Sequence, residues 1–451
     1  MVASPTVMRM RAADVAAAVG GDMIGPDVEV DGVAIDSRTV RGRPLFVPVV
    51  AERDGHDFIA TALAAGAPAY LTSQGRAAPG RGDGTAILVA DTTRALLDVG
   101  RLARRRLPDR VVGITGSVGK TSTKDLLVGV LRGHRRAAAS ERSFNNELGV
   151  PLTLANAADD AEVVVVEMGA RGPGHIALLC DAARPTIGVV TAVGDAHLEL
   201  FGSIEKVAAA KSELVAALPT SGTAVLNADD ELVAAMASRT PADVIRFGVT
   251  GGEVRAEGVK LDGELRASFQ LVTDWGRAPV RLAVHGRHHV TNALAAAAAG
   301  LACGLNTAQV AEGLAGAELS AMRMAWRRSP MGATVIDDAY NANPTSTRAA
   351  LASLAELPAR RRVAVLGVMA ELGQESGRFH QAVAREAAAA GIGLITVDAP
   401  AYGVGGADAV SQPEEAVERL GPLGEGDAVL VKGSRVAGLE RVVALLLDRS
   451  P

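Results

Sequence analysis

A glycine-rich turn between an apolar run and a helix-forming run is the stretch that most restricts this chain. Residues 111–115 are largely apolar and β-branched, as expected of a buried strand, and residues 123–128 have the pattern of a helix. The turn between them, residues 116–122, reads Gly-Ser-Val-Gly-Lys-Thr-Ser. In this arrangement glycine lets backbone N–H groups approach phosphate oxygens, and the helix N-terminus adds partial positive charge. The turn therefore predicts a binding site for a nucleoside triphosphate.

Individual side chains of this turn match the roles that a phosphate-binding loop requires. Lys120 would reach the β- and γ-phosphates, and the Thr121 hydroxyl would bind Mg²⁺. The other residues of the turn that we expect to contact nucleotide are Gly116, Gly119 and Ser122. The strict pattern has glycine five residues before Gly119, where this chain has Ile114. Gly116 is the loop glycine instead, and an ordinary strand–helix turn is the alternative.

Composition narrows the possible partners. Of the 451 residues 48% are hydrophobic but 3% are aromatic, and Ala, Val, Leu and Gly dominate, which is typical of helices packed closely on parallel sheets. A net charge of −5 argues against nucleic-acid binding. No apolar run approaches the length of a membrane span, and the N-terminus lacks a signal-peptide pattern. We therefore expect a cytoplasmic protein with small-molecule substrates, no nucleic-acid partner and no membrane insertion.

Changes of pattern divide the chain into three expected α/β domains. Residues 1–107 would form a small α/β domain, which ends after the basic run 104–106, interpreted as a solvated helix end. Residues 108–320 would form a central P-loop ATPase-type parallel sheet, with a small antiparallel flap at about 244–284. Residues 321–451 resemble a Rossmann unit without its dinucleotide glycine fingerprint, so this domain need not bind NAD.

The first domain holds one candidate binding segment. Residues 28–35 and 45–50 have strand character, and the first run ends at Asp36, Ser37 and Arg38. These three side chains could hold a polar ligand such as a sugar nucleotide. Equally, Asp and Ser could form a turn and Arg38 could be a surface charge. The sequence leaves both interpretations open.

Polar residues also follow the strands of the central domain. Glu167 ends the buried run 161–167, downstream of the phosphate loop, where a carboxylate suits Mg²⁺ or an ordered water. A helix-capping or ion-paired glutamate is the alternative. His197 follows the strand 187–191 near the same edge of the sheet, and Lys211 lies on the next, alanine-rich helix.

Taken together, these separate stretches resemble the Mur ligases, ATP-dependent enzymes that form amide bonds in peptidoglycan synthesis. The matching stretches are the phosphate loop, 143–149, 167–169, 196–199, Lys211, 288–292 and Arg323. Within this family, residues 337–344, 369–373 and 431–435 resemble the branch that adds D-alanyl-D-alanine to UDP-N-acetylmuramoyl-tripeptide. The Asp-Asn-Pro-Arg motif expected of the diaminopimelate-adding branch is absent from the sequence.

The resemblance implies a metal and carbamate site. Thr121 and Glu167 would hold a first Mg²⁺, and His197 a second. Lys211 matches the lysine that the family carries as a carbamate, formed from lysine and CO₂, which helps to place the metal. Lys120, His197, Lys211 and Arg323 would be the catalytic residues.

The resemblance also implies the nucleotide and substrate contacts. Asn292 would contact the adenine and Asp338 the ribose, while Arg323 would reach the γ-phosphate from the third domain. The residues expected at the UDP-sugar-peptide and the dipeptide are Asp36, Ser37 and Arg38 for the uridine nucleotide, and Asn145, Asn146, Ser434 and Arg435 for the peptide end. The implied enzyme is a monomeric, ADP-forming acid–amino-acid ligase, in which the third domain closes before an acyl phosphate forms.

Three positions depart from the family's usual residues. Ala192 replaces an asparagine, Met322 precedes Arg323 where a small or polar residue is usual, and Val368 replaces an acid. None is a phosphate, metal or carbamate residue, so ATP use should survive. The departures leave open a paralogue that ligates a different carboxylate and amine in specialised metabolism. A non-catalytic nucleotide-binding homologue is a further alternative.

Overall fold

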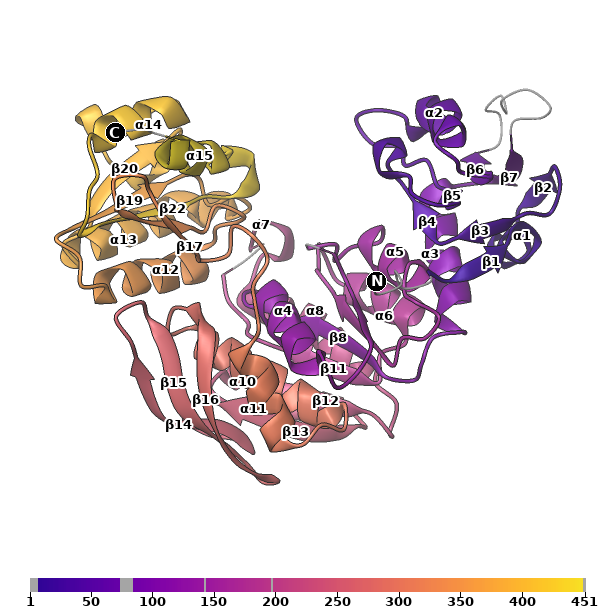
Figure 1. Cartoon of the computed structure of the whole chain (residues 1–451), viewed down its shortest axis with the longest axis horizontal. Coiled ribbons are helices and arrows are strands. Elements are labelled where there is room, and N and C mark those ends of the chain that lie inside the picture. The colour runs from indigo at the N-terminus through magenta and orange to yellow at the C-terminus, as the bar shows by residue number, and fades with distance from the viewer. Residues whose placement is uncertain (1–6, 74–83, 142, 196–197, 449–451) are drawn as a thin grey trace.

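The computed structural model describes residues 7–73, 84–141, 143–195 and 198–448. In Figure 1 the central part lies at the bottom, and the N-terminal part (indigo) and C-terminal part (yellow) rise from it on opposite sides. Each part contains a β-sheet with helices, so the expected three-part α/β architecture is confirmed. Within the described residues, no helix is long and apolar enough to cross a membrane.

The N-terminal part contains a five-stranded sheet in the order β2-β7-β6-β5-β4 and a separate antiparallel pair, β1 and β3. Residues 28–35, predicted as one strand, form two, because Gly32 between β3 and β4 has a φ of +70° that turns the chain. The predicted strand 45–50 ends at Phe46. The elements are β1 (Arg9–Arg11), α1 (Ala12–Val19), β2 (Asp22–Ile24), β3 (Glu29–Asp31), β4 (Val33–Ala34), β5 (Leu45–Phe46), α2 (Ile59–Ala64), β6 (Ala69–Ser73), β7 (Thr85–Val89) and α3 (Thr92–Arg104).

The central part contains a nine-stranded sheet in the order β16-β15-β14-β13-β12-β11-β8-β10-β9. Across the sheet, every neighbouring pair from β9 through β10, β8, β11, β12 and β13 to β14 is parallel. The pairs β14–β15 and β15–β16 are antiparallel, which confirms the predicted flap. The strands are β8 (Val111–Thr115), β9 (Ala137–Ala139), β10 (Val163–Glu167), β11 (Ile187–Val190), β12 (Thr223–Asn227), β13 (Asp243–Gly248), β14 (Val254–Leu261), β15 (Arg266–Thr273) and β16 (Gly276–His285). The helices are α4 (Lys120–Leu131), α5 (Gly149–Ala155), α6 (His175–Ala183), α7 (Leu198–Phe201), α8 (Ile204–Ala216), α9 (Glu231–Ala234), α10 (His289–Ala302) and α11 (Thr307–Ala315).

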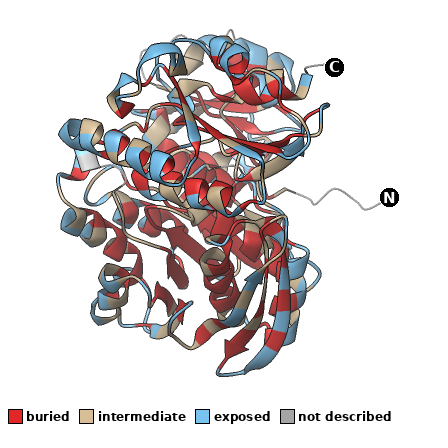
Figure 2. Cartoon of the chain, turned by 90° about the vertical axis from the view of Figure 1, so that its left-hand side faces the viewer, coloured by how far each residue is buried: buried red, intermediate tan, exposed pale blue. Residues whose placement is uncertain are grey.

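The C-terminal part contains a six-stranded sheet in the order β17-β18-β22-β19-β20-β21. The last strand along the chain, β22, lies between β18 and β19, so its C-terminal end adjoins the end of β18. Figure 2 shows these strands buried beneath helices whose outer faces are exposed. The elements are β17 (Ala325–Arg328), β18 (Thr334–Asp337), α12 (Pro344–Glu356), β19 (Arg361–Leu366), α13 (Ser376–Ala389), β20 (Gly393–Val397), β21 (Ala409–Val410), α14 (Pro413–Leu420), β22 (Asp427–Lys432) and α15 (Glu440–Asp448).

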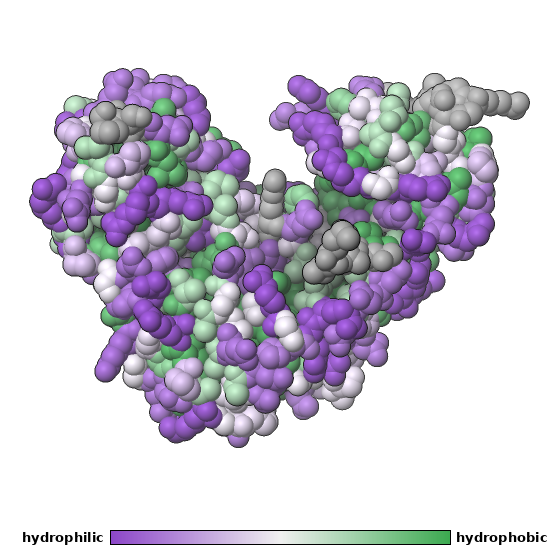
Figure 3. Space-filling view, in the orientation of Figure 1, coloured by the Kyte–Doolittle hydropathy of each residue, from purple (hydrophilic) through white to green (hydrophobic). Residues whose placement is uncertain are grey.

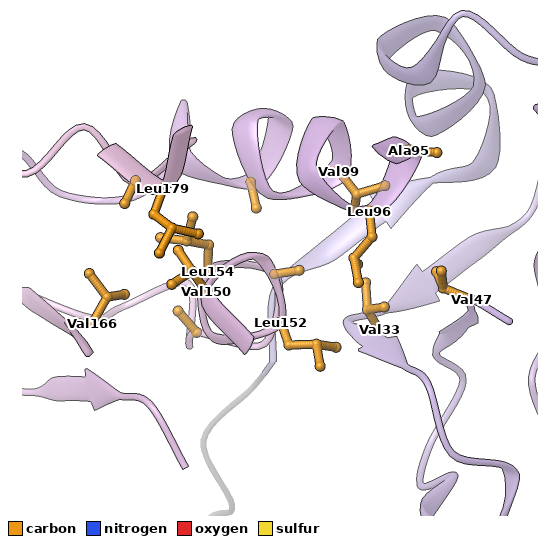
Figure 4. Close-up of a cluster of buried hydrophobic side chains, with 14 of the residues drawn as sticks. Val33, Val47, Ala95, Leu96, Val99, Val150, Leu152, Leu154, Val166 and Leu179 are labelled. Atoms are coloured by element: carbon orange, nitrogen blue, oxygen red, sulfur yellow. The ribbon is translucent and has the colours of Figure 1, made fainter. Parts of the chain in front are cut away.

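One hydrophobic core joins the N-terminal part to the central part. Figure 4 shows Leu96 of α3 beside Val33 of the N-terminal part, and Leu154 of α5 beside Leu179 of α6. All four side chains belong to one buried cluster. The interpretation of the basic run 104–106 as wholly solvated is wrong. Arg104 is buried, because its Nε donates to the carbonyl of Ala183 in α6 at 2.7 Å. The buried contact fixes α3 against the central part.

A cluster of aromatic side chains lies at the junction of the central and C-terminal parts. The rings of His285 and Trp326 stack with centroids 4.4 Å apart, and His288 lies against His289 at 4.1 Å. Buried Nδ1 of His288 and Nε2 of His289 have no hydrogen-bond partner in the described structure. Burial lowers the pKa of His288 to about 4 and that of His289 well below its usual range.

Gly100 tests the packing of α3 against the central part. A Cβ added there would lie 2.6 Å from Cβ of Pro151 in α5, so Gly100→Ala must push the two helices apart. We expect it to lower the free energy of unfolding by about 1–3 kcal/mol. Gly377 in α13 has open space where a Cβ would be added, so Gly377→Ala should raise that free energy by up to about 1 kcal/mol. Chemical denaturation measures the free energy of unfolding of both variants. Equal changes in the two variants would contradict the close packing of α3 on α5.

The lowered pKa values of His288 and His289 predict a dependence of stability on pH. His288 binds its proton more weakly in the folded state than at its usual pKa of 6.5, so protonation favours unfolding. The free energy of unfolding should therefore be retained above pH 6.5 and fall as the pH drops towards about 4. Denaturation between pH 7 and 5, roughly above the carboxylate range, measures the effect. His288→Gln should flatten this dependence, and an unchanged slope would contradict the assignment.

Candidate active site

A cleft of about 550 Å³ lies where the central and C-terminal parts meet. Figure 3 shows the molecule hollowed between its N-terminal and C-terminal parts, above the central part. Most of the predicted site residues line the cleft although they come from distant segments. They are Gly119, Lys120, Thr121, Ser122, Asn145, Asn146, Glu167, Asn292, Arg323, Asp338, Ser434 and Arg435.

The predicted phosphate loop joins the end of β8 to the start of α4 and encloses its own lysine. Gly116 and Gly119 have φ angles of +151° and +82°, which favour glycine. A Cβ at Gly119 would lie 2.4 Å from Oδ1 of Asn292, so the loop also packs directly on the start of α10. Nζ of Lys120 donates to the carbonyl of Gly116 at 2.6 Å. The lysine is thus folded back over the loop.

Thr121 and Glu167 form the centre of the cleft floor. The Thr121 hydroxyl donates to Oε2 of Glu167 at 2.8 Å, and Nδ2 of Asn145 donates to Oε1 at 2.8 Å. Glu167 is buried and Oγ of Ser143 lies 3.2 Å from Oγ1 of Thr121. Within the described ranges, no three His, Cys, Asp or Glu side chains gather as a metal cage. One carboxylate with a hydroxyl fits Mg²⁺, which usually keeps several waters and binds substrate phosphates.

Two lysines lie near this floor, Lys120 half-buried and Lys211 buried. Burial lowers the pKa of Lys120; the Glu167 carboxylate opposes this effect, and the charge of Arg323 adds to it. Lys211 lies on α8, is 3% exposed, and has its pKa lowered well below the usual range by burial and by the charge of Lys120. Lys211 does not line the cleft surface. Burial therefore shifts Lys211 towards the uncharged amine, relative to an exposed lysine.

Arg323 reaches the cleft floor from the C-terminal part. Its Nη2 donates to Oγ of Ser143 at 2.9 Å, and its guanidinium lies 4.4 Å from the ring centre of Tyr340. Beside it, Oδ2 of Asp338 accepts a hydrogen bond from Nζ of Lys432 at 2.5 Å. The structure therefore brings Arg323 and Asp338 to the same cleft as the phosphate loop.

The remaining predicted residues of the cleft differ in the hydrogen bonds and ion pairs that their side chains make. Nδ2 of Asn292 lies 3.2 Å from Nδ1 of His289, and Oγ of Ser434 donates to the carbonyl of Ala342 at 3.2 Å. Asn146 accepts hydrogen bonds from the backbone of its own loop. Arg435 is exposed and pairs with Glu440 at 3.1 Å.

The predicted uridine-site residues lie in the N-terminal part, away from the lining of the cleft. Asp36 caps the short turn of helix Ser37–Thr39 and binds the Arg38 guanidinium at 2.7 Å. Ser37 is buried, whereas Arg38 is exposed. The structure therefore contains a turn and a surface ion pair at these residues, and their contact with a uridine nucleotide stays a prediction. His197 lies outside the described residues.

The sequence reasoning missed several residues that shape the cleft. Ser143 joins Thr121 to Arg323, and Tyr340 stacks on Arg323, yet both lie in stretches noted only as matches. Two residues of the cleft lining, His175 and Arg171, contact Glu147: its carboxylate binds Nε2 of His175 at 3.0 Å and Nη1 of Arg171 at 3.3 Å. These contacts join separate loops, so sequence spacing carried no signal for them.

Two of the three departures from the family pattern meet the site through backbone atoms. The carbonyl of Ala192 accepts a hydrogen bond from the N–H of Ser117 at 2.7 Å. The carbonyl of Val368 accepts from the N–H of Ser434 at 2.9 Å. The third, Met322, has a φ of +59°, which explains why a small residue suits this position.

Comparisons with known proteins agree with this geometry. Residues 114–300 match the family model of the Mur ligase middle domain, and residues 322–435 match that of the Mur ligase, glutamate ligase domain. UDP-N-acetylmuramoyl-tripeptide–D-alanyl-D-alanine ligase of Mycobacterium tuberculosis is 40% identical over 92% of each chain. The enzyme of the same name from Escherichia coli is 35% identical over 95% of this chain and 96% of its own.

Solved structures show the same relationship. MurF from Acinetobacter baumannii superposes with a TM-score of 0.88 at 29% identity, covering 98% of this chain and all of its own. MurF ligase from Thermotoga maritima in complex with ADP gives a TM-score of 0.80 at 28% identity, over 92% of this chain and 96% of its own. The chain belongs to the Mur ligase family, in the MurF branch of ATP-dependent peptide-bond-forming ligases.

Proposed function

We propose that this chain joins D-alanyl-D-alanine to UDP-N-acetylmuramoyl-tripeptide, using ATP and releasing ADP and phosphate. The observation that carries the proposal is the cleft itself, which unites a phosphate loop, the Thr121–Glu167 pair and Arg323 from another part of the chain. Relatives that carry the name of this activity match nearly the full length of the chain. This agreement favours the cell-wall reaction over a paralogue with other substrates.

The phosphate loop would bind the ATP phosphates. Lys120 would leave the Gly116 carbonyl and contact the phosphate chain. The negative charge of the phosphates would stabilise the lysine ammonium, which burial disfavours. Thr121 and Glu167 would hold Mg²⁺, which when bound neutralises phosphate charge and orients the transferred group. Asn292 would contact the adenine and Asp338 the ribose, while His197 would contribute to a second metal site.

The first chemical step would activate the peptide carboxylate. A carboxylate oxygen attacks the γ-phosphorus, the bond from that phosphorus to the ADP oxygen breaks, and an acyl phosphate forms. Lys120 and Arg323 would stabilise the charge on the transferring group from opposite sides of the cleft. The dipeptide amine then attacks the acyl carbon, phosphate leaves with the bonding electrons, and the nitrogen loses a proton.

Lys211 would act as a carbamate. Its buried environment favours the uncharged amine, which is the form that attacks CO₂. The product is an anion that would be attracted to the charge of Lys120 and would help to order the metal site. The same burial that makes a lysine cation unfavourable therefore favours this modification.

The substrate ends would be bound by different parts of the chain. We assign residues 1–107 to the UDP-sugar, with Asp36, Ser37 and Arg38 at the uridine nucleotide. Residues 108–320 would bind ATP, and residues 321–451 would close over it. Asn145, Asn146, Ser434 and Arg435 would face the peptide end. Because ATP and the UDP-linked precursor are intracellular, we place the enzyme in the cytoplasm, where we propose that it acts as a monomer.

Phosphate release tests the proposed function. ATP and Mg²⁺ are supplied with UDP-N-acetylmuramoyl-tripeptide, with D-alanyl-D-alanine, with both or with neither. We expect sustained release only with both substrates, together with the mass of the pentapeptide product. Release with neither substrate, or only with a different amine, would contradict the assignment. Lys120→Met should reduce the rate by roughly 100-fold or more, because it removes transition-state charge stabilisation.

A pair of lysine substitutions on α8 tests the role of Lys211. Lys211→Met should lower kcat by roughly 100-fold, because methionine fills the buried space but forms no carbamate. Lys206→Met, on the same helix but exposed, should leave kcat unchanged. Intact-mass measurement of the wild type under bicarbonate should show the added CO₂, and Lys211→Met should lack it. Wild-type activity in Lys211→Met would exclude the carbamate.

A further inference from the structure

The turn that carries Arg323 into the cleft has an unfavourable backbone. Met322 and Met324, on either side of Arg323, have φ angles of +59° and +51°. This left-handed region is disfavoured for residues with a Cβ. Two such residues within three positions persist only where surrounding contacts hold them. The contacts at this turn therefore decide where the Arg323 side chain is presented.

Asp338 supplies one of these contacts and is itself held by a buried lysine. Its Oδ1 accepts a hydrogen bond from the backbone N–H of Met324 at 3.1 Å. Its Oδ2 binds Nζ of Lys432 at 2.5 Å, and the same Nζ donates to the carbonyl of Asn341 at 2.9 Å. Lys432 is 2% exposed, so these oxygen atoms take the place of water as hydrogen-bond partners of its side chain.

Sheet order explains why the lysine lies here. Strand β22 ends at Lys432 and pairs in parallel with β18, whose last residue precedes Asp338. A second contact ties the turn to the same segment, because the N–H of Tyr340 donates to the carbonyl of Met322 at 3.4 Å. The ring of Tyr340 then supports the Arg323 guanidinium at 4.4 Å. Residues 338–341 therefore form a platform for the turn.

We propose that Lys432 is a positioning residue: through Asp338 it holds the 322–324 turn so that Arg323 meets the transferring phosphate. This inference rests on the proposed function, in which Arg323 contacts the γ-phosphate. An ionised carboxylate has about four acceptor sites, so Asp338 can keep both contacts and still accept a ribose hydroxyl. The carboxylate that binds the nucleotide thus also fixes the arginine that acts on it.

A double-mutant cycle tests this coupling. We measure kcat for phosphate release with both substrates for wild type, Lys432→Met, Arg323→Ala and the double variant. We expect Lys432→Met to lower kcat by roughly tenfold and Arg323→Ala by roughly 100-fold. The double variant should remain within about threefold of Arg323→Ala, because positioning an absent side chain has no effect. Lys260→Met, an exposed control on β14, should match the wild type.

Independent losses would overturn the inference. If Lys432 had only a structural role, the two losses would multiply to roughly 1,000-fold in the double variant. Should Lys432→Met fail to fold, judged by its melting temperature, Asp338→Asn replaces it in the cycle, because asparagine removes the ion pair but keeps an acceptor oxygen. Asp338→Asn should raise the KM for ATP both in the wild type and in Arg323→Ala. It should lower kcat only in the protein that retains Arg323. An inactive wild type would contradict the proposed function and this inference with it; an active one with multiplying losses contradicts the inference alone.

Discussion

Parallel pairing of β8 with β10 and β11 is the constraint on which the site depends. The register sets Glu167 opposite Ile114, so β10 ends beside the point where the chain enters the phosphate loop. A slip of one residue would turn the Glu167 side chain to the opposite face of the sheet. The 2.8 Å contact between Thr121 and Glu167 is thus a consequence of backbone pairing. The same pairing brings the loop after β11 to Ser117, whose N–H binds the carbonyl of Ala192.

Sequence patterns predicted those features whose signals are local. The phosphate loop, the buried run ending at Glu167 and the antiparallel flap each depend on residues within a short window, and the structure contains all three. Arg104 was misjudged because its burial depends on carbonyl groups of α6, almost 80 residues away in sequence. The prediction of one strand over 28–35 failed because one glycine, Gly32, outweighs an otherwise strand-like run.

The departures from family residues illustrate a second limit of sequence reasoning. A side chain that differs from the family's usual residue suggests altered chemistry, yet Ala192 and Val368 contact the site through carbonyl oxygens that any residue provides. Met322 differs in kind, because its left-handed backbone makes the side chain itself unfavourable. Contacts from Asp338 and Tyr340 hold the turn despite that cost. The chain therefore tolerates methionine at this position because of the surrounding contacts.

Charge within the cleft differs from the charge of the whole chain. The protein carries a net charge of −5, but the cleft is lined by five cationic side chains and three carboxylates, with buried Lys211 close to Lys120. The cations are Lys120, Arg171, Arg323, Lys432 and Arg435, and the carboxylates are Glu167, Asp338 and Glu371. Such a local excess of positive groups attracts phosphates regardless of the overall sign. Burial is the main cause of the lowered pKa values of Lys120 and Lys211, and neighbouring positive charge, from Arg323 and Lys120 respectively, adds to it. Phosphate binding at Lys120 and the proposed carbamate at Lys211 would each reduce the repulsion between the two lysines.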